Sequence, residues 1–263
     1  MAKRADELLP AVAAIVADAG RMAMARWRTD FDRWEKAPGD PVSEVDLAVD
    51  AQLREALAGL MPDAGWLSEE TVDDADRLRR EHVWIVDPID GTRDYIRGRA
   101  GWAVSVALVE RGRVVLGVLD APARGEAWTA VLGRGARRNG EALHASDRAA
   151  LLGARVPADT LPKADRDLVA APKPNSIALR VATVASGEAD FVATQRWGHE
   201  WDIAAAALIA SEAGAIVTNA LGEPLGFNKR DPRAFGLMIG APGLHAAALE
   251  RFGPRARAIL AAA

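Results

Sequence analysis

The sequence feature that most constrains this chain is a short apolar run that leads into two aspartates. Residues 83–86 read Val-Trp-Ile-Val, and the turn-forming string 87–92 (Asp-Pro-Ile-Asp-Gly-Thr) follows directly. A short run of β-branched and aromatic residues favours a strand, so we expect Asp87 at its carboxyl end and Asp90 on the turn behind it. Two carboxylates three residues apart on a rigid turn can converge on one hard cation, because such cations prefer oxygen ligands.

The rest of this turn supplies further ligand groups. The carbonyl of Ile89 lies between the two aspartates and is a natural third ligand. Gly91 lets the backbone approach a ligand closely. If Thr92 begins a helix, the amides of Gly91 and Thr92 point at a bound phosphate. A plain pair of turns is the alternative, yet turn chemistry needs only a few of these residues.

Two other segments carry candidate carboxylates. Glu69 and Glu70 follow an apolar Trp-Leu pair, and Asp202 stands in Trp-Asp-Ile-Ala-Ala-Ala, where we expect a helix to begin. Taken alone, adjacent glutamates indicate a solvated face, and an acid at a helix start is favoured by the helix dipole. The functional interpretation depends on all three segments occurring in one chain and in this order.

Composition excludes several other classes of protein. The chain has 263 residues, a formal net charge of −4 and no cysteine, which excludes thiolate chemistry and gives no support to broad nucleic-acid binding. No P-loop motif and no Gly-x-Ser-x-Gly elbow occur, which argues against an NTP-binding loop and an α/β-hydrolase. The histidines are scattered, without the spacing of zinc ligands; they are His82, His144, His199 and His245.

The hydrophobic pattern predicts an α+β half followed by an α/β half. In the first half we expect helices over 5–27 and from Ser43 onward, strands over 83–86, 103–109, 113–119 and 126–131, and a hairpin at Asn139-Gly140. In the second half we expect helices over 175–186 and 202–213 and at the end, with strands over 189–194, 215–218 and 236–240. The fold class is therefore α+β and α/β in layers, with residues 1–150 as the half that contains the candidate carboxylates Glu69, Asp87 and Asp90, and residues 151–263 as the half that contains Asp202.

The helix that begins after Ser43 has a sequence signal at its start. Asp46 stands three residues after Ser43, which is a capping-box-like spacing. We expect Asp46 and Asp50 to share a face other than the buried stripe, which is formed by Val45, Val49, Leu53 and Leu57.

The amino-terminal segment does not match a signal peptide, because Asp6, Glu7, Pro10 and Asp18 interrupt its apolar residues. No run approaches the roughly 20 apolar residues of a membrane span. We therefore expect a cytoplasmic protein without a membrane partner.

These motifs together resemble the inositol monophosphatase superfamily over nearly the whole chain. The resemblance rests on Glu69-Glu70, on the string 87–92, and on Trp201-Asp202 followed by Glu212-Ala-Gly. It implies a layered αβαβα sandwich of the sugar phosphatase type with the site between its halves. It also implies two or three Mg²⁺ ions and an attacking water oriented by Glu69 and Thr92. The implied metal ligands are Glu69, Asp87, the Ile89 carbonyl, Asp90 and Asp202, with Asp46 reaching an outer ion through water.

Departures from the inositol-type pattern bear on the substrate. Gln195 stands where the inositol phosphatases often carry a glutamate that contacts inositol hydroxyls. Arg93-Asp94-Tyr95 replaces the usual triplet and is more similar to the 3′(2′),5′-bisphosphate nucleotidases of the CysQ type. Arg180 falls near a lysine of that branch, where it would meet a second phosphate; a solvated helix residue is the alternative.

The sequence therefore predicts a Mg²⁺-dependent phosphomonoesterase of a small phosphorylated metabolite. We expect 3′-phosphoadenosine 5′-phosphate as the substrate, with inositol phosphate as the alternative and a regulatory or RNA- or protein-binding role as the hypothesis from another class. The substrate-side residues would be Gly91, Thr92, Arg93, Arg180, Gln195 and Asp202. The resemblance also implies inhibition by lithium, and a homodimer is among the assemblies left open.

Overall fold

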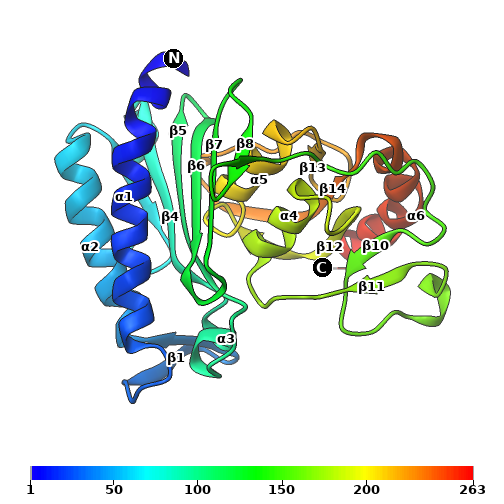
Figure 1. The fold of residues 1–263 in the computed structure, drawn as a ribbon, viewed down its shortest axis with the longest axis horizontal. Helices are drawn as coiled ribbons and strands as arrows, with labels where there is room; N and C mark the ends of the chain where they lie inside the picture. The colour runs from blue at the N-terminus through cyan, green and yellow to red at the C-terminus, as the bar shows by residue number, and fades with distance from the viewer. Residues whose placement is uncertain (1, 263) are drawn as a thin grey trace.

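The computed structural model describes residues 2–262 and shows five alternating layers (Figure 1). The first layer holds α1 (Ala2–Arg26) and α2 (Glu44–Leu60), and the third holds α4 (Ile177–Ala185) and α5 (Ala204–Glu212). A seven-stranded sheet lies between these helix pairs, a three-stranded sheet follows α4 and α5, and α6 (Pro242–Ala261) covers the far side. The predicted αβαβα sandwich is therefore confirmed.

The large sheet is a nearly continuous antiparallel meander in chain order from β3 to β9. Within the described part of this sheet, β3–β4 is the one parallel pair, so β3 and β4 end at the same edge. The strands are β3 (Gly65–Ser68), β4 (His82–Asp90), β5 (Ala103–Glu110), β6 (Arg113–Ala121), β7 (Glu126–Val131), β8 (Ala136–Arg138) and β9 (Glu141–Ala142).

The smaller pieces of β-structure lie in the second half and beside the first helix pair. The three-stranded sheet has the antiparallel order β12-β14-β13, and two short pairs, β1–β2 and β10–β11, stand apart from it. Their bounds are β1 (Arg33–Ala37), β2 (Asp40–Ser43), β10 (Arg155–Pro157), β11 (Val169–Ala171), β12 (Phe191–His199), β13 (Ile216–Thr218) and β14 (Arg233–Gly240). The remaining helices are α3 (Thr92–Ile96) and the 3₁₀ turns η1 (Ala75–Arg79), η2 (Pro122–Arg124) and η3 (Lys163–Asp165).

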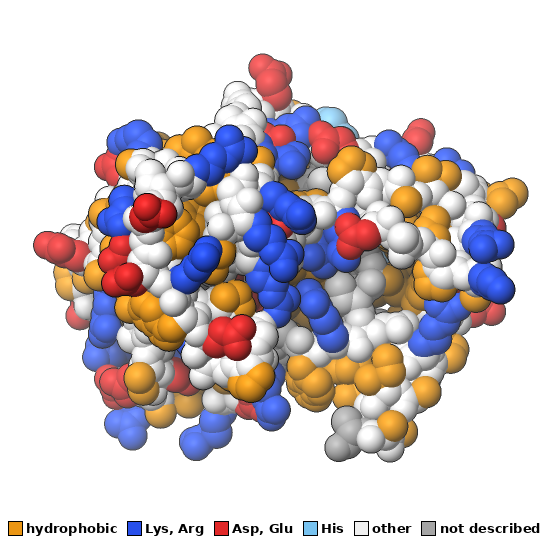
Figure 2. Space-filling model, turned by 90° about the horizontal axis from the view of Figure 1, so that it is seen from below, with side chains coloured by type: hydrophobic (Ala, Val, Ile, Leu, Met, Phe, Trp, Pro, Cys, Tyr) orange, Lys and Arg blue, Asp and Glu red, His pale blue; other side chains and the backbone are white. Residues whose placement is uncertain are grey.

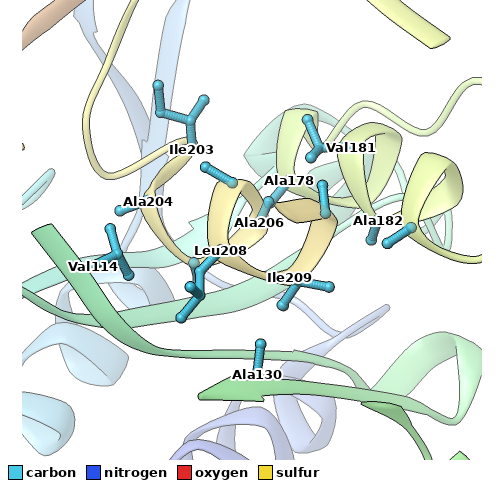
Figure 3. Close-up of a cluster of buried hydrophobic side chains, with 14 of the residues drawn as sticks. Val114, Ala130, Ala178, Val181, Ala182, Ile203, Ala204, Ala206, Leu208 and Ile209 are labelled. Carbon is cyan, nitrogen blue, oxygen red and sulfur yellow. The ribbon is translucent and has the colours of Figure 1, made fainter. Parts of the chain in front are cut away.

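The main core lies between the large sheet and the α4–α5 layer and is rich in alanine (Figure 3). Small side chains let α5 approach the sheet closely. A Cβ at Gly117 of β6 would lie 2.8 Å from the Ala205 carbonyl, so this position tolerates no side chain without moving the helix. Because this core joins the large sheet to the second half of the chain, the turn before α5 is held against the end of that sheet. The division near residue 150 stays a prediction.

The sequence signals of α2 are confirmed. Ser43 is the N-cap, and its amide donates to Asp46 Oδ2 over 2.9 Å. Asp46 and Asp50 are buried as well, and Asp50 accepts a hydrogen bond from Thr71 Oγ1 at 2.6 Å. The buried stripe contains the predicted residues Val45, Val49, Leu53 and Leu57.

Other predicted elements occur with shifted ends. The predicted strand 83–86 extends to Asp90, with a register shift between Asp87 and Asp90, and the helix predicted from residue 202 begins at Ala204. The hairpin at Asn139-Gly140 is present between β8 and β9, with a positive φ at both residues. The β1–β2 hairpin was not predicted.

Helix α1 corrects one prediction from the sequence. Over Ala5–Arg26 it is long and apolar enough to cross a membrane by length and composition alone. One face of it packs on the large sheet, through the buried residues Val12, Val16, Ala19 and Ala23. Core helices of soluble proteins and signal sequences near the N-terminus pass the same test, so the length and composition of α1 are only weak evidence for a membrane span.

Candidate metal centre and active site

A cavity of about 470 Å³ opens where β4 and α3 meet the turn between β12 and α5. The parallel pairing of β3 with β4 brings Glu69 and Asp87 to this edge together. The second half of the chain contributes Asp202 from the turn that precedes α5. The cavity therefore lies between the two halves, as the resemblance implies.

Three of the predicted metal ligands converge in this cavity. One carboxylate oxygen from each of Glu69, Asp87 and Asp202 lies within 4.8 Å of the other two. Asp87 is buried, and among the described residues its Oδ1 has no hydrogen-bond partner. A buried carboxylate oxygen without a partner is costly, and hard cations take oxygen ligands of this kind. The donor set therefore fits a magnesium-type ion.

The electrostatics of this cluster also suit the binding of a cation. Burial, followed by the nearby Glu69 and Asp90 carboxylates, holds the pKa of Asp87 well above its usual range. Burial and then the charge of Asp90 raise the pKa of Asp202 to about 8. Like charges crowded in a buried place resist ionisation, and a bound cation reverses that preference.

Asp90 lies beside this cluster, but its oxygens face the amino end of α4. Oδ2 accepts hydrogen bonds from Ser176 Oγ at 2.5 Å and from the Ala178 amide at 2.7 Å, and Oδ1 lies 3.3 Å from the Ile177 amide. Burial raises the pKa of Asp90 to about 6, although these hydrogen bonds work in the opposite direction. Asp90 thus ties the β4 turn to α4, in addition to its predicted role as a ligand.

Thr92 is held between two other predicted site groups. Its Oγ1 lies 3.1 Å from Asp46 Oδ1 and 3.0 Å from the Ile89 carbonyl oxygen. Burial raises the pKa of Asp46 to about 6, while hydrogen bonds from Ser43 and Thr92 lower it. The structure therefore connects Asp46 to the site through the Thr92 hydroxyl.

Gly91 is fixed by its backbone and by its neighbours. Its φ is +96°, and a Cβ there would lie 2.6 Å from the Gly101 carbonyl and 2.8 Å from the Ser176 amide. Only glycine adopts this conformation without strain. The close approach to residue 176 is a second contact between the β4 turn and the start of α4.

Lys36 is a site residue that the sequence analysis missed. From the β1–β2 hairpin its Nζ donates to Glu69 Oε1 at 2.8 Å and to Glu70 Oε1 at 2.9 Å. Burial alone would lower the pKa of Lys36, but the two glutamates together raise it. Burial raises the pKa of Glu70 to about 7. No local sequence signal indicated that this side chain would face the glutamates, which lie 33 and 34 positions further along the chain.

The predicted substrate-side residues are divided between the cavity and its surroundings. Arg93 lines the cavity and donates to the Gly39 carbonyl. Arg180 is buried, and its guanidinium donates to the Pro174 and Asn175 carbonyls at 2.7 Å each. Gln195 Nε2 donates to the Phe252 carbonyl at 2.9 Å. Neither Arg180 nor Gln195 is among the cavity-lining residues.

Arg196, the neighbour of Gln195, is a second cation that the sequence analysis missed. It is exposed and lines both the main cavity and an adjoining one of about 120 Å³. Within residues 2–262 it forms no hydrogen bond or ion pair. Half-exposed Trp197 lines both cavities beside it, and His199 stacks on Trp201 at 4.3 Å between ring centroids. The smaller cavity therefore extends the site over the Arg196 cation and the rings of Trp197 and His199.

The basic character of this end is visible in Figure 2, where Lys and Arg side chains gather in the hollow between the two parts of the molecule. The cavity itself combines three basic side chains, Lys36, Arg93 and Arg196, with the carboxylate cluster. A cavity lined by both basic and acidic side chains suits an anionic ligand that binds together with metal cations.

A layered sandwich with a carboxylate cavity between its halves defines a class of metal-assisted phosphatases, and the comparisons agree with it. The model of the inositol monophosphatase family matches residues 4–258. The chain belongs to this family, and it is a phosphoric monoester hydrolase.

The individual relatives span several named activities. The chain is 35% identical to a fructose-1,6-bisphosphatase/inositol-1-monophosphatase of Thermotoga maritima over 78% of this chain and 81% of the relative. It is 30% identical to the 3′(2′),5′-bisphosphate nucleotidase CysQ of Escherichia coli over 76% and 85%. Among solved structures, an IMPase of Thermotoga maritima superposes with a TM-score of 0.81 at 27% identity, over 95% of this chain and 98% of that one.

Proposed function

We propose that this chain is a Mg²⁺-dependent phosphatase of small phosphorylated metabolites. The observation that carries the proposal is the convergence of Glu69, Asp87 and Asp202, in which the buried Oδ1 of Asp87 has no hydrogen-bond partner within residues 2–262. No thiol exists to act as a nucleophile. Water activated in a metal site is the chemistry that suits such residues.

The proposed ligands of two or three ions are Glu69, Asp87, the Ile89 carbonyl, Asp90 and Asp202, with Asp46 acting through water. Magnesium bound there would neutralise the phosphate dianion, lower the pKa of a water molecule and stabilise the leaving alkoxide. Asp90 would keep one side of its carboxylate on the α4 amides while serving the site.

The remaining steps belong to side chains of the chain itself. Glu69, which lines the cavity, accepts a proton from the attacking water. Thr92 Oγ1, held by Asp46 and the Ile89 carbonyl, orients the same water. The amides of Gly91 and Thr92 and the side chain of Arg93 bind the phosphate oxygens. Catalysis is then positioning and electrostatic stabilisation, as phosphoryl transfer requires.

For the substrate, we propose a phosphate ester whose leaving group carries a second anionic group, with 3′-phosphoadenosine 5′-phosphate as the first compound to test. Arg196 supports this, because it faces both cavities without a partner among the described residues. Trp197 and His199 offer aromatic surface for a planar base. The CysQ relatives, named as bisphosphate nucleotidases, support the same substrate.

Inositol 1-phosphate is the alternative substrate, because several relatives are named inositol monophosphatases. A regulatory or RNA-binding role is the alternative from another class. The chain is 36% identical to a Pseudomonas aeruginosa protein named Nus factor SuhB, and the basic hollow in Figure 2 would suit an anionic partner. The carboxylate cluster favours catalysis. We further propose a cytoplasmic location, and a homodimer as the assembly to test by sedimentation.

The proposed function is tested with a panel of phosphate esters ranked by kcat/KM in the presence of Mg²⁺. We expect turnover that requires added Mg²⁺ and vanishes with EDTA. Glu69→Gln should lose nearly all turnover, because the substitution weakens Glu69 both as a metal ligand and as the proton acceptor. Glu188→Gln, on an exposed side chain that pairs with Arg138, is the matched control and should retain full activity. Turnover in EDTA, or full activity of Glu69→Gln, would contradict the proposal.

A further inference from the structure

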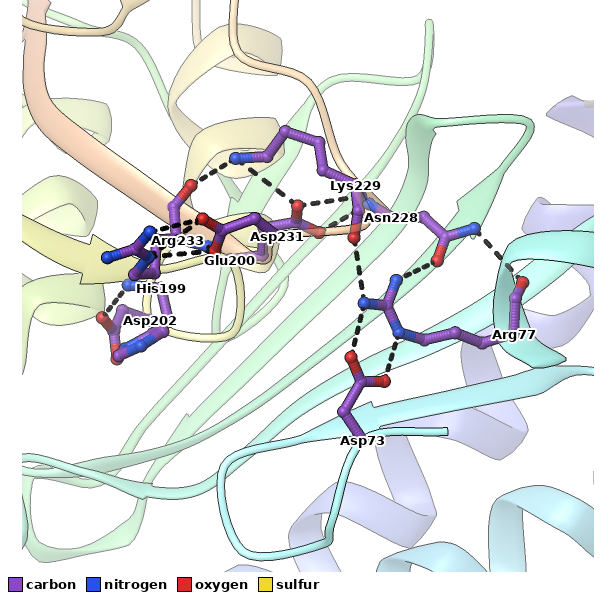
Figure 4. A network of polar contacts seen from close by, with 9 residues as sticks. All are labelled: Asp73, Arg77, His199, Glu200, Asp202, Asn228, Lys229, Asp231 and Arg233. Carbon is purple, nitrogen blue, oxygen red and sulfur yellow. Dashed lines mark hydrogen bonds and ion pairs between the residues drawn. The ribbon is translucent and has the colours of Figure 1, made fainter. Parts of the chain in front are cut away.

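Arg77 is a buried arginine that joins the two halves of the molecule away from the cavity (Figure 4). Its side chain is 1% exposed, whereas its partner Asp73 is 37% exposed. The guanidinium binds both Asp73 oxygens, through Nε at 2.6 Å and Nη2 at 2.8 Å. Its other donors reach across 151 and 152 positions of sequence, to Asn228 Oδ1 at 2.6 Å and to the Lys229 carbonyl at 2.9 Å.

The segment that Arg77 binds encloses a buried glutamate. Glu200 is fully buried, and its carboxylate accepts the Asn228 amide at 2.5 Å and the Lys229 amide at 3.0 Å. Lys229 Nζ lies 3.6 Å from Glu200 Oε1. Asn228 has a φ of +57°, the left-handed conformation that turns both amides toward one acceptor. Arg77 thus binds the 228–229 segment, and the amides of that segment bind the Glu200 carboxylate.

Glu200 stands in the turn that carries Asp202. The Glu200 carbonyl accepts the Ala204 amide at the start of α5, and the His199 amide donates to Asp202 Oδ2 at 2.7 Å. Fixing Glu200 from the side of residues 228 and 229 therefore fixes the backbone around Asp202.

At its other end Arg77 lies against the strand that leads to Glu69. A Cβ on Gly65, the first residue of β3, would lie 2.9 Å from Arg77 Cβ. β3 continues to Ser68, and the Glu69 amide then donates to the Val86 carbonyl on β4. The same arginine thus contacts the strand that positions Glu69 and the segment that positions the Asp202 turn.

We propose that Asp73, Arg77, Asn228, Lys229 and Glu200, named here the Arg77 clamp, hold Asp202 at the distance from Glu69 and Asp87 that a divalent cation requires. The inference rests on the proposed metal site. Three carboxylates at this distance repel one another, and the clamp keeps them from moving apart before the ion binds. Arg77 and Glu200 are positioning residues, because they reach the ligands through the backbone.

The packing of α5 on β6 also places the Asp202 turn, so the test has to separate the clamp from general stability. The probe is Mn²⁺, whose binding is measured directly from the loss of the free-ion EPR signal. The clamp variants are Glu200→Gln, which places an amide NH₂ against one backbone donor, and Asp73→Ala, which removes a partly exposed partner of Arg77. Asp165→Asn is the matched control, because it weakens another carboxylate–arginine cluster, in which the buried Asp165 binds the more exposed Arg251 and Arg255.

We expect the clamp variants to bind Mn²⁺ at least about tenfold more weakly, because replacing a residue that orients metal ligands commonly lowers metal affinity by this factor. The Mg²⁺ concentration for half-maximal turnover should rise by a similar factor, while kcat at saturating Mg²⁺ changes less than about threefold. Asp165→Asn should lower the melting temperature without changing the affinity for Mn²⁺. In an Asp202→Asn background, Asp73→Ala should add no further loss, because the ligand it positions is gone.

Three results would overturn the clamp. One is unchanged Mn²⁺ affinity in folded Glu200→Gln and Asp73→Ala. Another is an equal loss of affinity in Asp165→Asn. The third is a full additional loss from Asp73→Ala when Asp202→Asn is already present. Absence of Mn²⁺ binding by the wild-type chain would instead overturn the proposed metal site, and the clamp with it.

Discussion

The carboxylate of Asp90, on the turn after β4, accepts hydrogen bonds from the hydroxyl of Ser176 at 2.5 Å and from two amides at the start of α4. These residues are 86 to 88 positions apart in sequence. Asp90 therefore has a structural partner in the second half of the chain as well as a proposed role at the metal.

The dual role of Asp90 gives the first prediction. Asp90→Asn should lower kcat at least about a thousandfold, because a metal site supplies several kcal/mol of transition-state stabilisation and about 1.4 kcal/mol corresponds to a factor of ten. Ser176→Ala should lower the free energy of unfolding by about 1 kcal/mol through the lost helix cap, while kcat falls no more than about tenfold. Steady-state kinetics and urea unfolding measure both effects. Equal kinetic losses in the two variants would contradict the ligand role of Asp90.

Much of this arrangement follows from local sequence signals. Hydrophobic period and turn chemistry are properties of neighbouring residues, so the β4 strand, the capping box of α2 and the 87–92 turn were predictable. The contacts of Asp90 with Ser176 and of Arg77 with Asn228 were not predictable, because these partners lie 86 and 151 positions away along the chain. Lys36 was missed for a related reason, since only the unpredicted hairpin brings it to Glu69.

Substrate-side residues show the same limit more sharply. Arg180 and Gln195 were chosen by their place relative to family motifs, yet their side chains bind backbone carbonyls, and neither residue is among those that line the cavity. One residue further along the strand, Arg196 lines the cavity. A shift of one position reverses the face of a strand, so the register near the bulge between Thr194 and Trp197 decides which side chain meets a ligand.

The second prediction separates these two arginines. Arg196→Ala should lower kcat/KM for 3′-phosphoadenosine 5′-phosphate by roughly 10- to 100-fold, the worth of a charge-assisted hydrogen bond. It should have little effect on adenosine 3′-monophosphate, which lacks the second phosphate. Arg180→Ala should lower kcat/KM for both substrates by a similar factor. It should also lower the melting temperature, because it removes a buried donor to the 174–175 loop. A loss confined to the bisphosphate in Arg180→Ala would assign the second phosphate to Arg180 instead.

The third prediction is inhibition by lithium, which the family resemblance implies. The ion is expected near Asp202, where it would hold product phosphate in place. Turnover is measured against rising LiCl at saturating Mg²⁺, with NaCl at the same ionic strength as the control. An equal response to both salts would argue against a metal site of this kind.

The last prediction concerns Asp120, a carboxylate outside the active site that α1 covers. A Cβ on Gly20 would lie 1.8 Å from Asp120 Oδ2, so the backbone of α1 packs directly against this carboxylate. Burial raises its pKa from 3.8 to about 6. The folded chain thus binds the proton more tightly than the unfolded chain, and stability falls as pH rises from about 4 to 6.

Asp120→Asn should raise the free energy of unfolding at pH 8 by about 1 kcal/mol after allowance for partial exposure, and the gain should shrink toward zero near pH 4. Urea unfolding at both pH values measures this, with the exposed Asp63→Asn as control. A gain that does not depend on pH would contradict the assignment of the shift to Asp120.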